Sequence, residues 1–118
     1  MNLNEFTRAT YQGEKSTDAF GFYTRPRIFC KDGFMFSVQG SEGHYCSPRT
    51  NSKEFSAMEI GFPNQVEELI LDFAEDRDNP TETVYGYVDA EIIQEVIDKH
   101  GGIDIEKTMG YDKVEVIE

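Results

Sequence analysis

The chain has two cysteines and two histidines, and these are its residues best suited to nucleophilic or metal chemistry. His44 and Cys46 lie two positions apart, and in an extended segment such residues share a face, so a histidine base could activate a thiol there. No third residue that would orient the base is evident. Zinc is not expected, because this spacing matches no common ligand pair and structural zinc needs four ligands. A polar loop is the simpler interpretation of GSEGHYCSPRT (40–50).

Carboxylates are far more numerous, with 23 Asp and Glu among 118 residues. Acid catalysis needs a shielded carboxyl group with a raised pKa, and these acids fall at polar positions of the expected helices and loops. Motifs of zinc proteases, serine hydrolases and phosphate-binding loops are absent. The segment DRDNPTE (76–82) lacks the central Gly and the terminal bidentate Glu of a calcium loop. We therefore expect no enzyme, no metal site and no cofactor.

The net charge of -12 arises entirely in the second half of the chain. Residues 1–66 carry seven acids and seven bases, whereas residues 67–118 carry sixteen acids and four bases. Such a field repels nucleic acid and attracts basic protein surfaces. A solvated face that only keeps the protein soluble is the alternative explanation.

The elements that must position these residues begin with a predicted hairpin. Asp32-Gly33 separates two apolar, β-rich runs, and this dipeptide is typical of a two-residue hairpin loop. With that loop, Cys30 would face Met35 and Phe29 would face Phe36. A third strand is predicted within FSAMEIGF (55–62), whose Met58, Ile60 and Phe62 alternate on one face.

Two amphipathic helices are predicted after this sheet. Asn64, with Glu67 three residues later, is typical of a helix start, and apolar residues recur in helical spacing at Val66, Leu69, Ile70 and Phe73. TVYGYV (83–88) predicts a strand. Asp89 is expected to cap a second helix, which buries Ile92, Ile93, Val96 and Ile97 and extends to about His100, where Gly101-Gly102 ends it. The C-terminal residues 111–118 alternate as an edge strand would.

Together these elements predict an α+β fold, a mainly antiparallel sheet of four to five strands with two helices on one face. Residues 1–118 are expected to form a single domain, with 1–19 as an N-terminal arm and 20–118 as the α+β core. No apolar run of 18 residues occurs, and the start has no export-signal pattern, so we expect a cytoplasmic protein. Reduced thiols are expected there, although a bridge between Cys30 and Cys46 stays open.

The carboxylates of the second half are the better candidates for a functional site. Glu91, Glu95 and Asp98 fall on one stripe of the second helix, where four residues advance about 6 Å, close to the spacing of charges along a nucleic-acid strand. The predicted partner-binding residues are Glu67, Glu68, Asp72, Glu75, Asp76, Asp78, Glu91, Glu95 and Asp98. Secondary contacts are predicted at His44, Tyr45 and Arg49.

Four blocks carry a family resemblance: RPRIFCKDGFMFSVQ, HYCSPR, SAMEIGFP and NPTETVYGYVDAEIIQEVIDKHGG. Over about residues 20–102 the chain resembles small accessory proteins of bacteriophages and prophages. The resemblance implies a protein that acts against host systems, similar in a general sense to anti-CRISPR or anti-restriction inhibitors, and it brings no catalytic motif.

The resulting hypothesis is a phage-encoded inhibitor in the host bacterial cytoplasm. Its acidic face would mimic nucleic acid and block the basic nucleic-acid-binding surface of a host defence complex, such as a Cas effector, without binding nucleic acid or a membrane itself. One alternative is a phage structural or accessory module that contacts another phage protein through exposed aromatics of the YGY strand or the hairpin. The other alternative is a small thiol enzyme centred on Cys46.

Overall fold

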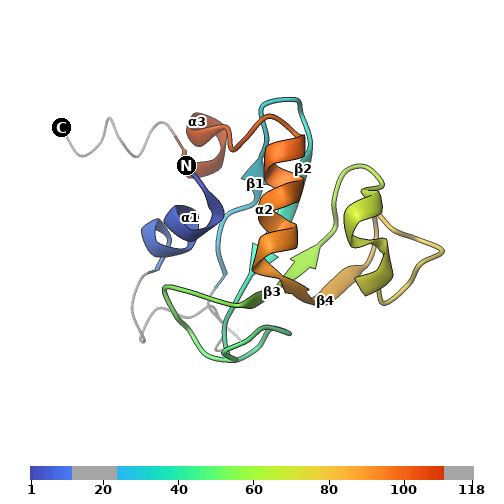
Figure 1. The fold of residues 1–118 in the computed structure, drawn as a ribbon, viewed down its shortest axis with the longest axis horizontal. Coiled ribbons are helices and arrows are strands. Elements are labelled where there is room, and N and C mark those ends of the chain that lie inside the picture. Colours follow the sequence, from blue (N-terminus) through green and yellow to red (C-terminus); the bar gives the residue numbers. More distant parts are fainter. Residues whose placement is uncertain (12–23, 111–118) are drawn as a thin grey trace.

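The computed structural model describes residues 1–11 and 24–110, which contain one four-stranded antiparallel sheet and several helices (Figure 1). The strands, in sheet order, are β1 (Ile28–Phe29), β2 (Met35–Gln39), β3 (Ala57–Gly61) and β4 (Val84–Asp89). The helices are α1 (Leu3–Ala9), α2 (Ala90–Lys99), α3 (Ile105–Met109) and the 3-10 helix η1 (Glu68–Phe73). The predicted α+β class is confirmed. The edge strand predicted at 111–118 lies outside the described residues.

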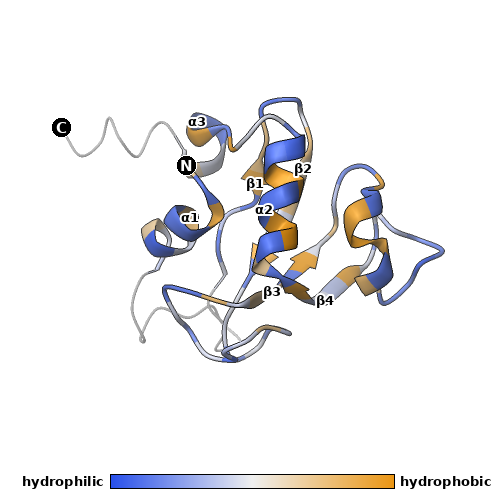
Figure 2. Ribbon diagram, in the orientation of Figure 1, coloured by the Kyte–Doolittle hydropathy of each residue, from blue (hydrophilic) through white to orange (hydrophobic). Residues whose placement is uncertain are grey.

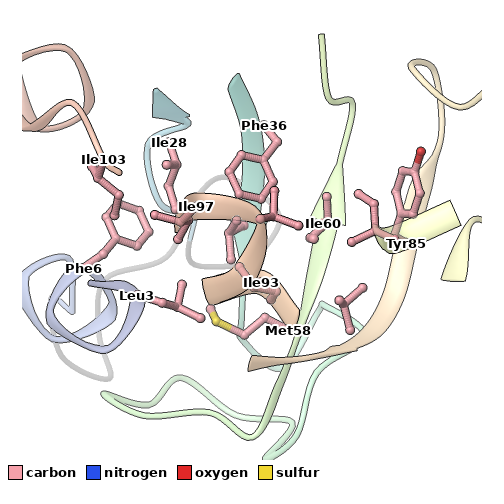
Figure 3. Close-up of a cluster of buried hydrophobic side chains, with 14 of the residues drawn as sticks. Leu3, Phe6, Ile28, Phe36, Met58, Ile60, Tyr85, Ile93, Ile97 and Ile103 are labelled. Atoms are coloured by element: carbon pink, nitrogen blue, oxygen red, sulfur yellow. The ribbon is translucent and has the colours of Figure 1, made fainter. Parts of the chain in front are cut away.

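The core lies between the sheet and helix α2, which crosses one of its faces (Figure 3). Ile93, Val96 and Ile97 of α2 are buried, and they pack with buried residues of the sheet such as Met58 and Ile60. Full burial of each such side chain contributes about 1.5–3 kcal/mol relative to exposure. The opposite side of α2 is polar, as Figure 2 shows, so the helix has one face for the core and one for solvent.

Helix α1 extends the core on the side of the N-terminal arm. Leu3 and Phe6 are buried in the same cluster as the α2 residues. The helix begins with a capping box, in which the Asn2 side chain accepts the Glu5 N–H and the Glu5 side chain accepts the Asn2 N–H. The part of the arm from residue 12 to 19 lies outside the described residues.

The first hairpin has a three-residue loop, so its predicted register is wrong by one position. Ile28 pairs with Phe36 and Phe29 with Met35, whereas a two-residue loop would pair Phe29 with Phe36. Gly33 has a φ of 99°, and Asp32 Oδ1 accepts the Phe34 N–H at 2.9 Å. The Asp side-chain turn and the left-handed Gly are typical of a longer hairpin loop with a bulge.

The helix predicted to start at Asn64 forms later and as a 3-10 helix. Asn64 Oδ1 accepts the Met35 N–H at 2.8 Å, and its amide donates to Gly33 O at 3.0 Å, so this side chain ties the hairpin instead of capping a helix. Glu67 is the N-cap, and its carboxylate accepts the Leu69 N–H at 2.9 Å. Val66 and Leu69, predicted to be buried, are exposed, while Ile70 is buried.

A β-bulge in β4 changes which of its residues face the core. Met58 pairs with Val88 and Ile60 with Tyr85, so two residues of β4, Gly86 and Tyr87, lie opposite the single residue between Met58 and Ile60. The bulge lets Tyr85 and Val88 both be buried and leaves Tyr87 exposed. Among the described residues, no helix is long and apolar enough to cross a membrane.

Candidate protein-binding surface

The outer side of α2 carries the acidic stripe Glu91, Glu95 and Asp98, as predicted. All three side chains are exposed. Within residues 1–11 and 24–110 no cation pairs with them, since Lys99, the one base of α2, is directed to Glu67 at 2.9 Å. Gln94 Nε2 donates to Asp98 Oδ1 at 2.9 Å, which leaves the charge of that carboxylate unneutralised. The stripe therefore keeps three negative charges on a rigid helix.

The remaining exposed acids among the predicted partner-binding residues lie on η1 and on the loop that follows it. This group consists of Glu68, Asp72, Glu75, Asp76 and Asp78. Asp72 pairs with Arg77 at 3.5 Å, and Asp76 shapes its own loop by accepting the Asp78 N–H and the Asn79 amide. In Figure 1 this loop projects away from α2. The predicted acids thus form two groups on different elements.

Glu67 was predicted to contact a partner, and this prediction is wrong because its side chain is buried, with 1% exposure. Its carboxylate accepts hydrogen bonds from Lys99 Nζ at 2.9 Å and from the Leu69 N–H, and it lies 2.7 Å from His100 Nε2. Burial disfavours the charged form, but the hydrogen bonds from Leu69, Lys99 and His100 outweigh it, so the pKa of Glu67 is lowered. Glu67 therefore holds η1 to the end of α2.

His100 connects Glu67 to the first hairpin. Its Nδ1 lies 2.6 Å from Asp32 Oδ2, and its ring stacks on Phe34 with centroids 4.1 Å apart. The hydrogen bond that Asp32 accepts from the Phe34 N–H, and next the contact with His100, lower the pKa of Asp32. Each ring nitrogen of His100 therefore lies within hydrogen-bond distance of a carboxylate from a different element. This cluster joins three elements and has a structural role.

The side chains of both cysteines are buried. Cys46 is 1% exposed, its Sγ donates to Ser41 O at 3.3 Å, and burial is the main cause that raises its pKa. Burial and the charge of Asp32 raise the pKa of Cys30 to about 12. Both cysteines are free, so the structure has no bridge between them. Protonated, buried thiols are poor nucleophiles.

In the loop 40–50, Tyr45 lies between Arg49, which was also predicted as a contact residue, and Tyr87, which was not among the predicted site residues. Tyr45 contacts Tyr87 with ring centroids 5.9 Å apart, and the Arg49 guanidinium lies 5.4 Å from the Tyr45 ring. Tyr45 and Tyr87 are 41% and 49% exposed. His44 contacts its own loop, with Nδ1 2.6 Å from Ser41 Oγ. The YGY motif was the sequence signal for exposed tyrosines in this strand, but the bulge determines that Tyr87 is exposed and Tyr85 is buried.

A cavity of about 270 Å³ lies between the start of α1, the start of α2 and the segment 54–55. Its apolar lining is Leu3, Phe55, Met58 and Ala90, and its polar lining is mostly uncharged, with Glu54 and Glu91 as the ionisable exceptions. Within the described part of the chain, no group of three or more His, Cys, Asp or Glu residues is arranged to hold a metal ion.

Comparison of the chain with protein-family models, with curated proteins and with solved structures gave no match in any of the three.

Proposed function

We propose that the protein is an inhibitory binding protein, whose acidic α2 stripe occupies a Lys/Arg-lined surface of a nucleic-acid-binding protein and competes with the nucleic acid. The observation that carries the proposal is the stripe of Glu91, Glu95 and Asp98, exposed and without a paired cation in the described chain. Full charges at this spacing attract a basic surface from a distance and accelerate association.

The rigid attachment of the stripe to the core favours this binding function over an acidic face that only keeps the protein soluble. Helix α2 is fixed to the core by Ile93, Val96 and Ile97, and Lys99 is withdrawn from the stripe by its contact with buried Glu67. A rigid carboxylate row loses little side-chain and backbone freedom on binding compared with a mobile acidic tail. The exposed acids of η1 and its loop add long-range attraction from a second element.

The sequence resemblance supplies the biological setting of the proposal. An accessory protein of a bacteriophage or prophage would meet host defence complexes, whose channels for DNA or RNA are lined with Lys and Arg. The proposed partner is therefore such a complex in the host cytoplasm, with a Cas effector as one example. In this proposal the protein itself binds neither nucleic acid nor a membrane.

Charge reversal on the stripe tests the proposal. A variant with Glu91→Lys, Glu95→Lys and Asp98→Lys should lose capture of the host complex from lysate and restore its binding to nucleic acid. The matched control reverses three exposed acids elsewhere, Glu42, Glu54 and Glu106, and so has the same net charge. We expect the control to retain most of the inhibition, and wild-type capture to weaken steeply between about 50 and 500 mM salt, a range over which the screening length changes about threefold. Equal inhibition by both variants and by the wild type, or capture that ignores salt, would contradict the stripe mechanism.

A further inference from the structure

Two exposed tyrosines from distant parts of the chain are held together against β4. The Tyr87 N–H donates to Tyr45 O at 3.0 Å, which fixes the 40–50 loop to the strand. Gly86 makes room for the contact, because a Cβ there would lie 3.3 Å from Tyr45 Cβ. We call Tyr45 and Tyr87 the tyrosine pair. Its backbone is fixed on both sides, so the two rings are presented in a defined arrangement.

Tyr87 has a backbone conformation in which a tyrosine is uncommon. Its φ is 53°, in the left-handed region, where a residue with a Cβ is disfavoured and Gly or Asn is usual. The bulge explains why the backbone takes this conformation, since it turns Tyr85 and Val88 inward. It does not explain a tyrosine there, because the ring is half exposed and contributes little to the core. Strain of this kind is often kept where the side chain has a function.

The surroundings of the pair are suited to a cation. The Arg49 guanidinium already lies over the Tyr45 ring at 5.4 Å, whereas no described cation lies over Tyr87. Glu59 Oε1 accepts the Tyr45 N–H at 3.1 Å, and exposed Asp89 follows Tyr87 by two residues on the same strand. Aromatic faces and nearby carboxylates both attract positive charge, and arginine also stacks its planar group on the ring.

We propose that the tyrosine pair is an arginine-binding site in which Tyr87 receives an arginine side chain of the basic partner. This inference rests on the proposed function, because it is the acidic protein's partner that supplies the arginine. The acids then set the association rate with the partner, and the fixed aromatic site sets the dissociation rate. Tyr and Arg residues commonly contribute most of the binding energy of an interface.

Two peptides of equal charge, amidated tetra-arginine and tetra-lysine, serve as probes in calorimetric and NMR titrations at constant salt. We expect the wild type to prefer tetra-arginine by about three- to tenfold, the size of a partly desolvated cation–π contact. Tyr87→Leu should remove that preference without changing net charge, and Tyr87→Phe should retain it. Phe62→Leu is the matched control, since Phe62 is also half exposed and has a φ of 49°.

The outcomes separate this site from general attraction of cations by an acidic protein. Equal wild-type affinity for the two peptides, or equal loss of preference in Tyr87→Leu and Phe62→Leu, would overturn the arginine site. The stripe reversal should weaken both peptides alike and leave their ratio unchanged. A preserved arginine preference together with failure of the host-complex experiment would overturn the proposed function while leaving the arginine site standing.

Discussion

His100 Nε2 lies 2.7 Å from Oε1 of Glu67, although 33 residues separate the two in the chain. The same ring reaches Asp32 in the first hairpin, and Lys99 completes the contacts of the Glu67 carboxylate. The hairpin loop, the start of η1 and the end of α2 are thus joined through one imidazole. This junction fixes the position of the acidic helix relative to the acidic 3-10 segment.

Removal of the ring should destabilise the fold. For His100→Ala we expect a loss of about 2–4 kcal/mol in the free energy of unfolding, because buried Glu67 loses a charge-assisted partner and Phe34 loses its stacked neighbour. Urea denaturation followed by circular dichroism measures this. Asp32→Asn is the control with a smaller expected loss, since Asp32 is half exposed and Asn still accepts the Phe34 N–H. A loss below about 0.5 kcal/mol for His100→Ala, the size of an ordinary surface change, would contradict the junction.

Acid should weaken the same junction. The pKa values of Glu67 and Asp32 are lower in the folded protein than in the unfolded chain. The unfolded state therefore binds more protons in acid, so stability is present above the ordinary carboxyl values near about pH 4 and is lost as the pH falls below them. Urea midpoints between neutral pH and about pH 3 should decline, and Glu67→Gln, although less stable at neutral pH, should show a shallower decline. Parallel curves for the two proteins would show that Glu67 contributes nothing to the acid response.

Patterns that depend on neighbours in sequence were predictable. The alternation around Met58 and Ile60 and the helical spacing of Ile93, Val96 and Ile97 each reflect a single local period, and the structure has both elements. The exposed α2 stripe follows from the same period. The class of the fold and one of the two acidic groups therefore follow from local sequence patterns alone.

Side chains that bond across the fold were not predictable in this way. Asn64 and Glu67 match a helix start by residue type, but Asn64 bonds the hairpin, and the Lys99 and His100 partners of Glu67 lie more than thirty residues away. The β4 bulge also broke the alternation that would place Tyr85 and Tyr87 on one face. The tyrosine pair depends on that bulge and on a loop contact, neither of which has a local signature.

The left-handed conformation of Tyr87 can be tested by comparing the stabilities of Gly and Ala variants at this position. Tyr87→Gly should be more stable than Tyr87→Ala by about 1 kcal/mol, because Gly has no Cβ to strain at positive φ. The same comparison at Ser37, in β2, whose pairing with β3 is regular, should have the opposite sign, since Gly weakens an ordinary strand. Denaturation midpoints of the four variants give the answer, and the same sign at both positions would contradict the bulge conformation.

Thiol accessibility offers a test of the two cysteines. We expect Cys30 and Cys46 to react slowly with a disulfide reagent in the folded protein at about pH 8 and rapidly in denaturant, because burial keeps both thiols protonated. Colour release over time measures the rates, and single Cys→Ala variants assign them. Rapid labelling of Cys46 in the native protein would contradict the burial of its thiol and favour the thiol-enzyme alternative.

Among the described glycines that lack a positive φ, Gly40 should tolerate a side chain least. A Cβ there would lie 2.5 Å from the ring of buried Phe55, which would have to shift as a whole, whereas a Cβ at Gly61 would meet Ser37 Cβ at an ordinary 3.6 Å. We expect Gly40→Ala to lower the free energy of unfolding by about 1–3 kcal/mol, and Gly61→Ala to change it by less than about 0.5 kcal/mol. Chemical denaturation of both variants, with slopes compared to the wild type, measures the difference. Equal midpoints for the two would mean that Phe55 does not pack over Gly40 in solution.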